Sequence, residues 1–228
     1  MFGITQQELV QDAVLISIFL LLAFPVHEFA HAFVAYRLGD GTAKVFGRLT
    51  LNPIVHFDPF GGLLLVITAL SGSGLLFGWA KPTPVNPSNL RDRRNGEVAV
   101  ALAGPASNLI MACLGAVVFR VLDTAGVFDP STIDSVNDPR VLLFNVLTLF
   151  VEINIVLAIF NLIPVPPLDG SAILFRLISP MTAWRIRPVL AQYGSIILLG
   201  TIFVLFFSPL GNVLGTLIND VTKLLLGL

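Results

Sequence analysis

Two histidines and one glutamate have a spacing that could support chemistry. They lie in the sequence HEFAH, residues 27–31. On a helix, residues four positions apart project from the same face, so His27 and His31 can bind one zinc ion. Glu28 would lie beside that ion, where a carboxylate can act as a general base toward water. The spacing therefore predicts the zinc site of a hydrolase.

The best candidate for a third ligand is Asp169. Zinc ions that catalyse hydrolysis are typically held by three protein ligands, with one position left for water. Asp169 follows three prolines in the sequence NLIPVPPLDG, residues 161–170, and prolines end a helix and hold the chain extended. The predicted topology brings this stretch to the same side of the membrane as the two histidines.

Three other ionisable residues are rivals for a role near this site. Glu152 is the only other carboxylate predicted deep in a span, where acidic residues are typically functional. It could orient a ligand histidine or conduct protons. His56 and Asp58 lie in NPIVHFDP, residues 52–59, where turn formation is the simpler interpretation. A catalytic role for these two residues stays open.

Two asparagines are placed inside predicted spans. Asn108 ends the sequence GPASN, residues 104–108, and Asn161 begins the proline-rich stretch. An amide in the membrane can hold a substrate backbone or a developing oxyanion. It can also make a hydrogen bond between helices, and for each asparagine taken alone this structural role is the simpler interpretation.

The elements that position these residues are apolar helices. The 228 residues are 55% hydrophobic and only 12% charged, whereas soluble domains have about 25% charged residues. We therefore expect an all-α polytopic membrane protein, with residues 1–228 forming a single membrane-embedded core. About five to six transmembrane helices are expected, because roughly 20 apolar residues span a bilayer. The candidates are residues 12–37, 97–122, 141–163 and 188–207, with 210–227 either crossing or lying flat.

Basic residues indicate the orientation of these helices. They gather after the first helix, before residue 97 and before residue 188, and cytoplasmic loops are rich in Lys and Arg. This pattern requires the glycine-rich segment 60–79 to enter and leave on one side, as a re-entrant hairpin or β-like loop. An ordinary sixth span is the alternative. The N-terminus is then outside, and the HEFAH sequence lies toward the cytoplasmic side.

Charge and cysteine usage exclude several other functions. The net charge is −1, so there is no basic field for a nucleic acid. The single cysteine, Cys113, excludes an intramolecular disulfide and a zinc site built from cysteines. The first twelve residues contain no Lys or Arg, so we expect no cleaved signal peptide and a first helix that stays in the protein.

Three motifs together resemble the site-2 protease family of intramembrane zinc metalloproteases. They are HEFAH, GPASN and NLIPVPPLDG, and they occur in the order found in that family. The resemblance implies that His27, His31 and Asp169 bind Zn2+, that Glu28 activates water, and that Asn108 and Asn161 position the substrate. The chain resembles the small prokaryotic type, without an inserted PDZ domain or a C-terminal regulatory domain.

The resulting hypothesis is a zinc endopeptidase in the cell membrane. It would cleave transmembrane segments of membrane proteins within the lipid bilayer, in the process called regulated intramembrane proteolysis. A regulatory membrane partner is left open. Two alternatives use the same residues, namely a metal-ion or proton transporter and a catalytically silent scaffold with structural zinc.

Overall fold

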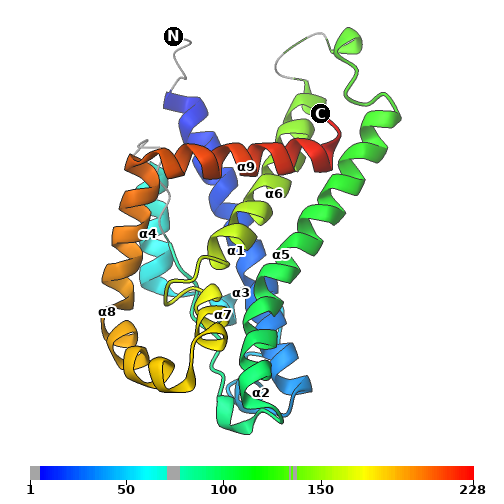
Figure 1. Cartoon of the computed structure of the whole chain (residues 1–228). Coiled ribbons are helices and arrows are strands. Elements are labelled where there is room, and N and C mark those ends of the chain that lie inside the picture. The colour runs from blue at the N-terminus through cyan, green and yellow to red at the C-terminus, as the bar shows by residue number, and fades with distance from the viewer. Residues whose placement is uncertain (1–5, 71–77, 134, 136–137) are drawn as a thin grey trace. The chain divides into compact units, whose positions relative to one another are not determined.

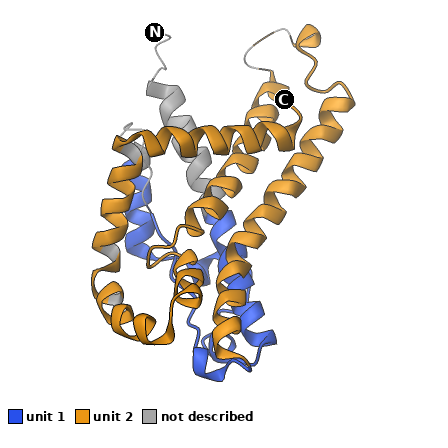
Figure 2. Cartoon of the chain, viewed as in Figure 1, with its two compact units in different colours: residues 1–91 blue, residues 92–228 orange. Residues whose placement is uncertain are grey.

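The chain divides into two compact units, each built from helices. The computed structural model describes residues 6–70, 78–133, 135 and 138–228 (Figure 1). Unit 1 comprises residues 1–91 and unit 2 comprises residues 92–228 (Figure 2). No strand occurs among the residues that the structure describes. The predicted all-α class is therefore confirmed for these residues.

Unit 1 is organised around one long helix that carries the HEFAH sequence. This helix, α1, spans Gln6–Arg37, and three shorter helices contact it. They are α2 (Thr42–Val45), α3 (Pro53–His56) and α4 (Pro59–Leu70). An irregular stretch then leads through residues 78–86 to the short 3-10 helix η1 (Pro87–Asn89). These helices and the irregular stretches between them make up the described part of unit 1.

Helix α4 begins the segment that the sequence predicts to be re-entrant. Asp58 caps it, because its Oδ1 accepts hydrogen bonds from the backbone nitrogens of Phe60 (3.0 Å) and Gly61 (2.9 Å). Its 12 residues extend roughly 18 Å, which is shorter than the hydrocarbon core of a bilayer. A β-carbon on Gly61 would collide with the carbonyl oxygen of Trp79. The chain therefore returns to the start of α4, in agreement with a re-entrant path.

The β-like form predicted for residues 60–79 is wrong for residues 60–70, which are helical. A helix satisfies its backbone hydrogen bonds internally, which suits an apolar segment in a membrane. Gly61 and Gly62 cost this helix little, since they lie in its first turn and allow close contacts. A β-carbon on Gly62 would collide with the ring of Phe57. Residues 71–77 lie outside the described part of the chain.

Unit 2 contains the longer apolar helices, and several begin at a proline preceded by a capping residue. Asp138, Ser179 and Ser208 accept hydrogen bonds from backbone nitrogens in the first turns of their helices. Proline is favoured at this position because its missing N–H has no partner there in any case. The elements are α5 (Arg93–Thr124), η2 (Pro130–Thr132), α6 (Pro139–Asn161), α7 (Gly170–Leu177), α8 (Pro180–Phe207) and α9 (Pro209–Leu226).

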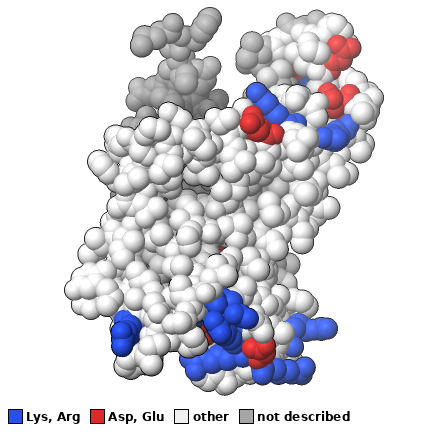
Figure 3. Space-filling model, in the orientation of Figure 1, with Lys and Arg blue, Asp and Glu red and all other residues white. Residues whose placement is uncertain are grey.

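Two helices of unit 2, α5 and α6, are long and apolar enough to cross a membrane. From Val98 to Phe119, α5 has no Asp, Glu, Lys or Arg, and this stretch extends roughly 33 Å. On the face that Figure 3 shows, charged side chains of unit 2 gather toward its two ends, and the surface between them is almost entirely uncharged. These helices correspond to the predicted spans 97–122 and 141–163.

Helix α8 differs from the predicted span 188–207 because it begins at Pro180 and is bent. Its parts 180–190 and 192–205 meet at 57°, shortly after Pro188. Proline inside a helix removes one backbone hydrogen bond and typically produces such a bend. If the bent pair is one span, the described residues contain three candidate spans, so the expected five to six are not confirmed.

Helix α9 lies across α6 in unit 2 (Figure 1). It is not among the helices of the described chain that are apolar enough to span a membrane. Arg120 of α5 holds its C-terminal end, since Nε donates a hydrogen bond of 2.6 Å to the carbonyl oxygen of Leu225. Leu226 is buried in the core of the unit, with Ala112, Ala116, Phe119, Phe128, Val151 and Ile155.

Candidate active site

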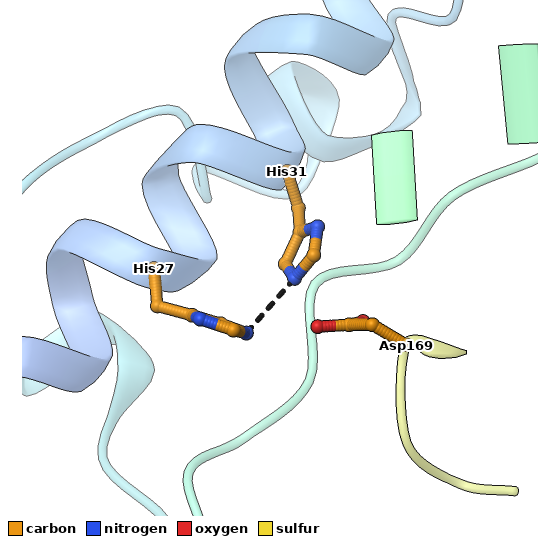
Figure 4. A group of neighbouring side chains, drawn as sticks. All are labelled: His27, His31 and Asp169. Carbon is orange, nitrogen blue, oxygen red and sulfur yellow. Dashed lines mark hydrogen bonds between the residues drawn. The ribbon is translucent and has the colours of Figure 1, made fainter. Parts of the chain in front are cut away.

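The two histidines of HEFAH face one another on α1, as the spacing predicts. Their Nε2 atoms are 3.0 Å apart, and their rings meet edge to face at 82° (Figure 4). Both side chains are buried, with exposed fractions of 5% for His27 and 7% for His31. Because residues four apart lie one above the other on a helix, α1 alone brings these two nitrogens together.

This pair of nitrogens fits a zinc ion. Zinc–nitrogen bonds are about 2.0–2.1 Å long, so two ligands at a tetrahedral angle are about 3.3 Å apart. The observed separation of 3.0 Å between the Nε2 atoms is close to that value. Two imidazole lone pairs at this distance repel unless a proton or a metal ion lies between them. The donor atoms and their geometry therefore suit a metal ligand pair.

Glu28 is half-buried beside the two histidines, and Thr83 holds it. The backbone nitrogen of Thr83 donates a hydrogen bond of 2.8 Å to Oε2 of Glu28. The Thr83 hydroxyl donates a second one, of 3.0 Å, to the backbone carbonyl oxygen of Glu28. The sequence analysis did not identify Thr83. The one available signal was its place in Pro82-Thr83-Pro84, which is typical of an extended segment.

Asp40, a second residue that the sequence analysis missed, fixes the chain around this site. Its side chain is fully buried, and it accepts hydrogen bonds from the Asn86 backbone nitrogen (2.7 Å) and Asn89 Nδ2 (2.9 Å). Burial raises the pKa of the Asp40 carboxyl, but hydrogen bonds from Thr42, Asn89 and Asn86 more than offset it, and the pKa is below its usual value. Asp40 thus fastens the segment after Thr83 to the end of α1.

Asp169 immediately precedes α7 in unit 2 and is half-buried (Figure 4 draws it with the two histidines). Its position is fixed by the loop after α6. A β-carbon on Gly170 would collide with the carbonyl oxygen of Leu162 and lie 2.6 Å from that of Ile163. The two ends of the loop are therefore in direct contact, and Asp169 is held at the end of α6 as the prolines predict.

The two predicted substrate-binding asparagines lie in α5 and α6 of unit 2. Asn108 is fully buried, and its Nδ2 donates a hydrogen bond of 3.1 Å to Oδ1 of Asn154. Asn161 Nδ2 donates to the carbonyl oxygen of Leu157 in its own helix (2.9 Å). Asn108 therefore makes the interhelical bond that was its alternative interpretation. Substrate binding by Asn108 and Asn161 stays a prediction.

The rival residues take mostly structural positions. Asp58 caps α4, and His56 is buried with its Nε2 donating a hydrogen bond of 2.8 Å to the carbonyl oxygen of Thr50. Both observations agree with the turn interpretation of residues 52–59. Glu152 is exposed on α6. Its proposed roles beside a histidine or in proton transfer stay predictions.

Comparison with known proteins relates this chain to peptidases. The family described as Peptidase family M50 matches residues 14–208. "Putative zinc metalloprotease YwhC" of Bacillus subtilis (strain 168) is 40% identical over 193 residues, which cover 85% of this chain and 80% of that protein. "Putative zinc metalloprotease Rip2" of Mycobacterium tuberculosis (strain ATCC 25618 / H37Rv) is 32% identical over 200 residues, covering 84% and 66% respectively. No solved structure matches the chain.

A metallopeptidase motif with two buried histidines and a match over most of the chain define the class of this molecule, a membrane-embedded protease. The chain belongs to peptidase family M50. The resemblance to the site-2 protease family, drawn from three motifs, is thereby confirmed. The transporter alternative is not favoured.

Proposed function

We propose that the protein is a zinc-dependent endopeptidase that cleaves transmembrane segments of other proteins within the membrane. The observation that carries this proposal is the geometry on α1, where the Nε2 atoms of His27 and His31 are 3.0 Å apart and Glu28 lies between them in sequence. The printed names of the relatives support zinc as the metal. The helices α5 and α6 support a location in the membrane.

We assign the zinc ligands to His27, His31 and Asp169. Two imidazoles and one carboxylate are a common ligand set of hydrolytic zinc, which leaves one position open. Asp169 belongs to unit 2, and its replacement by Asn tests its participation directly. When bound, zinc lowers the pKa of water and polarises the carbonyl group that is attacked.

Glu28 acts as the general base in this proposal. Its carboxylate takes a proton from the attacking water and later donates it to the leaving amine. One of its oxygens, Oε2, accepts the backbone N–H of Thr83, and in this proposal the other oxygen takes the proton of the water. Burial of the two histidines beside it limits access of bulk water to the site.

The substrate must expose a peptide bond that a membrane helix normally conceals. In a transmembrane helix every backbone carbonyl is engaged in an internal hydrogen bond. Cleavage therefore requires local unwinding, which helix-breaking residues in the substrate would favour. Asn108 and Asn161 are the predicted contacts for the unwound backbone. The substrates in this proposal are membrane proteins.

The charge pattern supports an orientation in the cell membrane. Arg91, Arg93 and Arg94 lie at the start of α5, whereas the loop between α5 and α6 is acidic. Cytoplasmic loops collect Lys and Arg, so the start of α5 is assigned to the cytoplasm. The N-terminus is then outside, and the site lies toward the cytoplasmic side of a multi-pass protein.

The proposal is tested by reconstituting the protein in liposomes with a model transmembrane peptide. Wild type should cleave the peptide, and Glu28→Gln should be slower by about 10²–10⁴-fold, since general base catalysis contributes that much. Zinc content, measured by elemental analysis of the purified protein, should persist in Glu28→Gln and fall in His27→Ala. Equal cleavage by wild type and Glu28→Gln would remove Glu28 as the base.

A further inference from the structure

Among the residues that the structure describes, Glu28 is held by one that lies far from it in sequence. Thr83 contacts it twice, through its backbone nitrogen to Oε2 (2.8 Å) and through its hydroxyl to the Glu28 carbonyl oxygen (3.0 Å). The first is a charge-assisted hydrogen bond, a class that is shorter and stronger than bonds between neutral groups. Both residues belong to unit 1. The contact therefore depends only on the fold of that unit.

The sequence around Thr83 makes its backbone nitrogen a specific donor. Pro82 and Pro84 have no N–H, so Thr83 supplies the only backbone donor of this tripeptide. Proline also fixes its own backbone and favours an extended residue before it. A carboxylate next to residues 82–84 can thus accept a backbone hydrogen bond at one point only. That point is occupied by Oε2 of Glu28.

The segment that carries Thr83 is anchored on both sides, independently of Glu28. Before it, the Lys81 nitrogen donates to the carbonyl oxygen of His56 (2.8 Å). After it, the Asn86 nitrogen donates to Oδ2 of Asp40 (2.7 Å), and the Arg91 nitrogen donates to the carbonyl oxygen of Leu38 (3.0 Å). The segment therefore holds Thr83 beside Glu28 through hydrogen bonds that do not involve Glu28 itself.

These contacts restrict a side chain that would otherwise have considerable rotational freedom. A glutamate has three side-chain torsions, and holding one carboxylate oxygen fixes the direction of the other. Catalysis by a base depends on that direction, because the base must lie within hydrogen-bond reach of the proton it removes. A fixed carboxylate is prepared for this step before the substrate arrives.

We propose that Thr83 is a positioning residue for Glu28, which it orients through its backbone N–H and secures through its hydroxyl. This inference rests on the proposed function, in which Glu28 is the general base. It assigns a catalytic purpose to the segment Pro82-Thr83-Pro84, which none of the three family motifs includes.

The contact itself is tested without any cleavage assay. The protein is labelled with ¹⁵N-threonine in detergent micelles, and hydrogen exchange of individual Thr amides is followed by NMR. Thr42 is the matched control, since its backbone nitrogen also donates to a carboxylate, that of Asp40 (3.0 Å). In Glu28→Ala, the Thr83 amide should exchange about tenfold faster or more, and the Thr42 amide should be unchanged. Unchanged exchange at Thr83 would overturn the proposal.

The consequence for the reaction is tested with three substitutions. Thr83→Ser keeps both donors, Thr83→Val removes the hydroxyl, and Thr83→Pro removes the hydroxyl and the N–H. We expect Thr83→Ser to keep the activity of wild type and Thr83→Val to lower kcat severalfold. Thr83→Pro should lower kcat about 10–100-fold, with KM and zinc content retained. Zinc content and slow exchange at Thr42 show that the Pro variant is folded.

The outcomes separate this inference from the proposed function. If Glu28→Gln is inactive and the folded Thr83→Pro variant keeps the kcat of wild type, Thr83 does not position the base although the enzyme assignment holds. If Glu28→Gln is fully active, the base assignment fails irrespective of Thr83. A loss of zinc or a raised KM as the main effect of Thr83→Pro would indicate a structural role and would also overturn the inference.

Discussion

Asn108 and Asn154 join α5 to α6 by a buried hydrogen bond of 3.1 Å between their side-chain amides. Asn154 in turn donates to the carbonyl oxygen of Phe150 in its own helix (2.9 Å). The two helices approach closely near this pair, because a β-carbon on Gly115 would lie 2.7 Å from the Phe150 ring. The side-chain amide of Asn108, in the GPASN sequence, thus contributes to the packing of α5 against α6.

This pair can be dissected by a double-mutant cycle. Asn108→Ala and Asn154→Ala should each destabilise the protein, and their coupling should be about 0.6–1.7 kcal/mol, as for hydrogen bonds between membrane helices. Unfolding in detergent measures this coupling. If Asn108 also binds substrate, Asn108→Ala should raise KM more than Asn154→Ala does. Equal KM values in the two variants would exclude substrate binding by Asn108 and leave it a role in helix packing alone.

Removal of the third ligand should weaken zinc binding. We expect Asp169→Asn to lower zinc affinity about a hundredfold or more, because loss of groups that merely support ligands already costs 10–100-fold. Competition with a chelator measures this affinity. Asp129→Asn is the control, since Asp129 is exposed and only caps the short helix η2. Similar zinc affinity in both variants would exclude Asp169 as a ligand.

Asp40 should make the free energy of unfolding of the protein depend on pH. Hydrogen bonds hold its pKa below the usual 3.8, so it stabilises the folded state above that pH and the contribution is lost as the pH falls further. We expect Asp40→Asn to cost about 3 kcal/mol at pH 7. The difference from wild type should shrink below about pH 4, when measured by unfolding of the zinc-free proteins. A difference that is constant with pH would contradict this prediction.

The close return of the chain to α4 can be tested at Gly61. An alanine there would collide with the Trp79 carbonyl oxygen, so Gly61→Ala should destabilise the protein by about 1–3 kcal/mol. Gly215→Ala is the matched control, because a β-carbon at Gly215 of α9 meets nothing within 4 Å. The control should be neutral or stabilising by up to about 1 kcal/mol. Equal stability of the two variants would refute the contact.

Local rules predicted the parts of the site that belong to one element. The spacing of His27 and His31 is a property of the helix alone, and the prolines of residues 164–167 end α6 wherever it packs. The same rules gave the wrong form for residues 60–70. Glycine counts against a helix in its interior, but Gly61 and Gly62 lie in a first turn that Asp58 caps.

The contacts that local rules missed join distant parts of the chain. Thr83 meets Glu28 across 55 residues, and Asn86 meets Asp40 across 46. The sequence separation of these pairs corresponds to no regular spacing within a helix. Each contact instead depends on how the intervening segment folds back. The bend of α8 was missed for a related reason. Pro188 was taken as the start of a span, whereas Ser179 caps a helix that already begins at Pro180.

The contact of Gly170 with the backbone of Leu162 and Ile163 has an evolutionary consequence. A loop whose two ends are fastened together can change in length without displacing the helix after it. In descendants of this gene, changes in loop length should therefore be tolerated only away from Pro166, whose backbone lies against Gly194 of α8. Replacement of Gly170 by any larger residue should not be, even though glycine has no chemistry of its own.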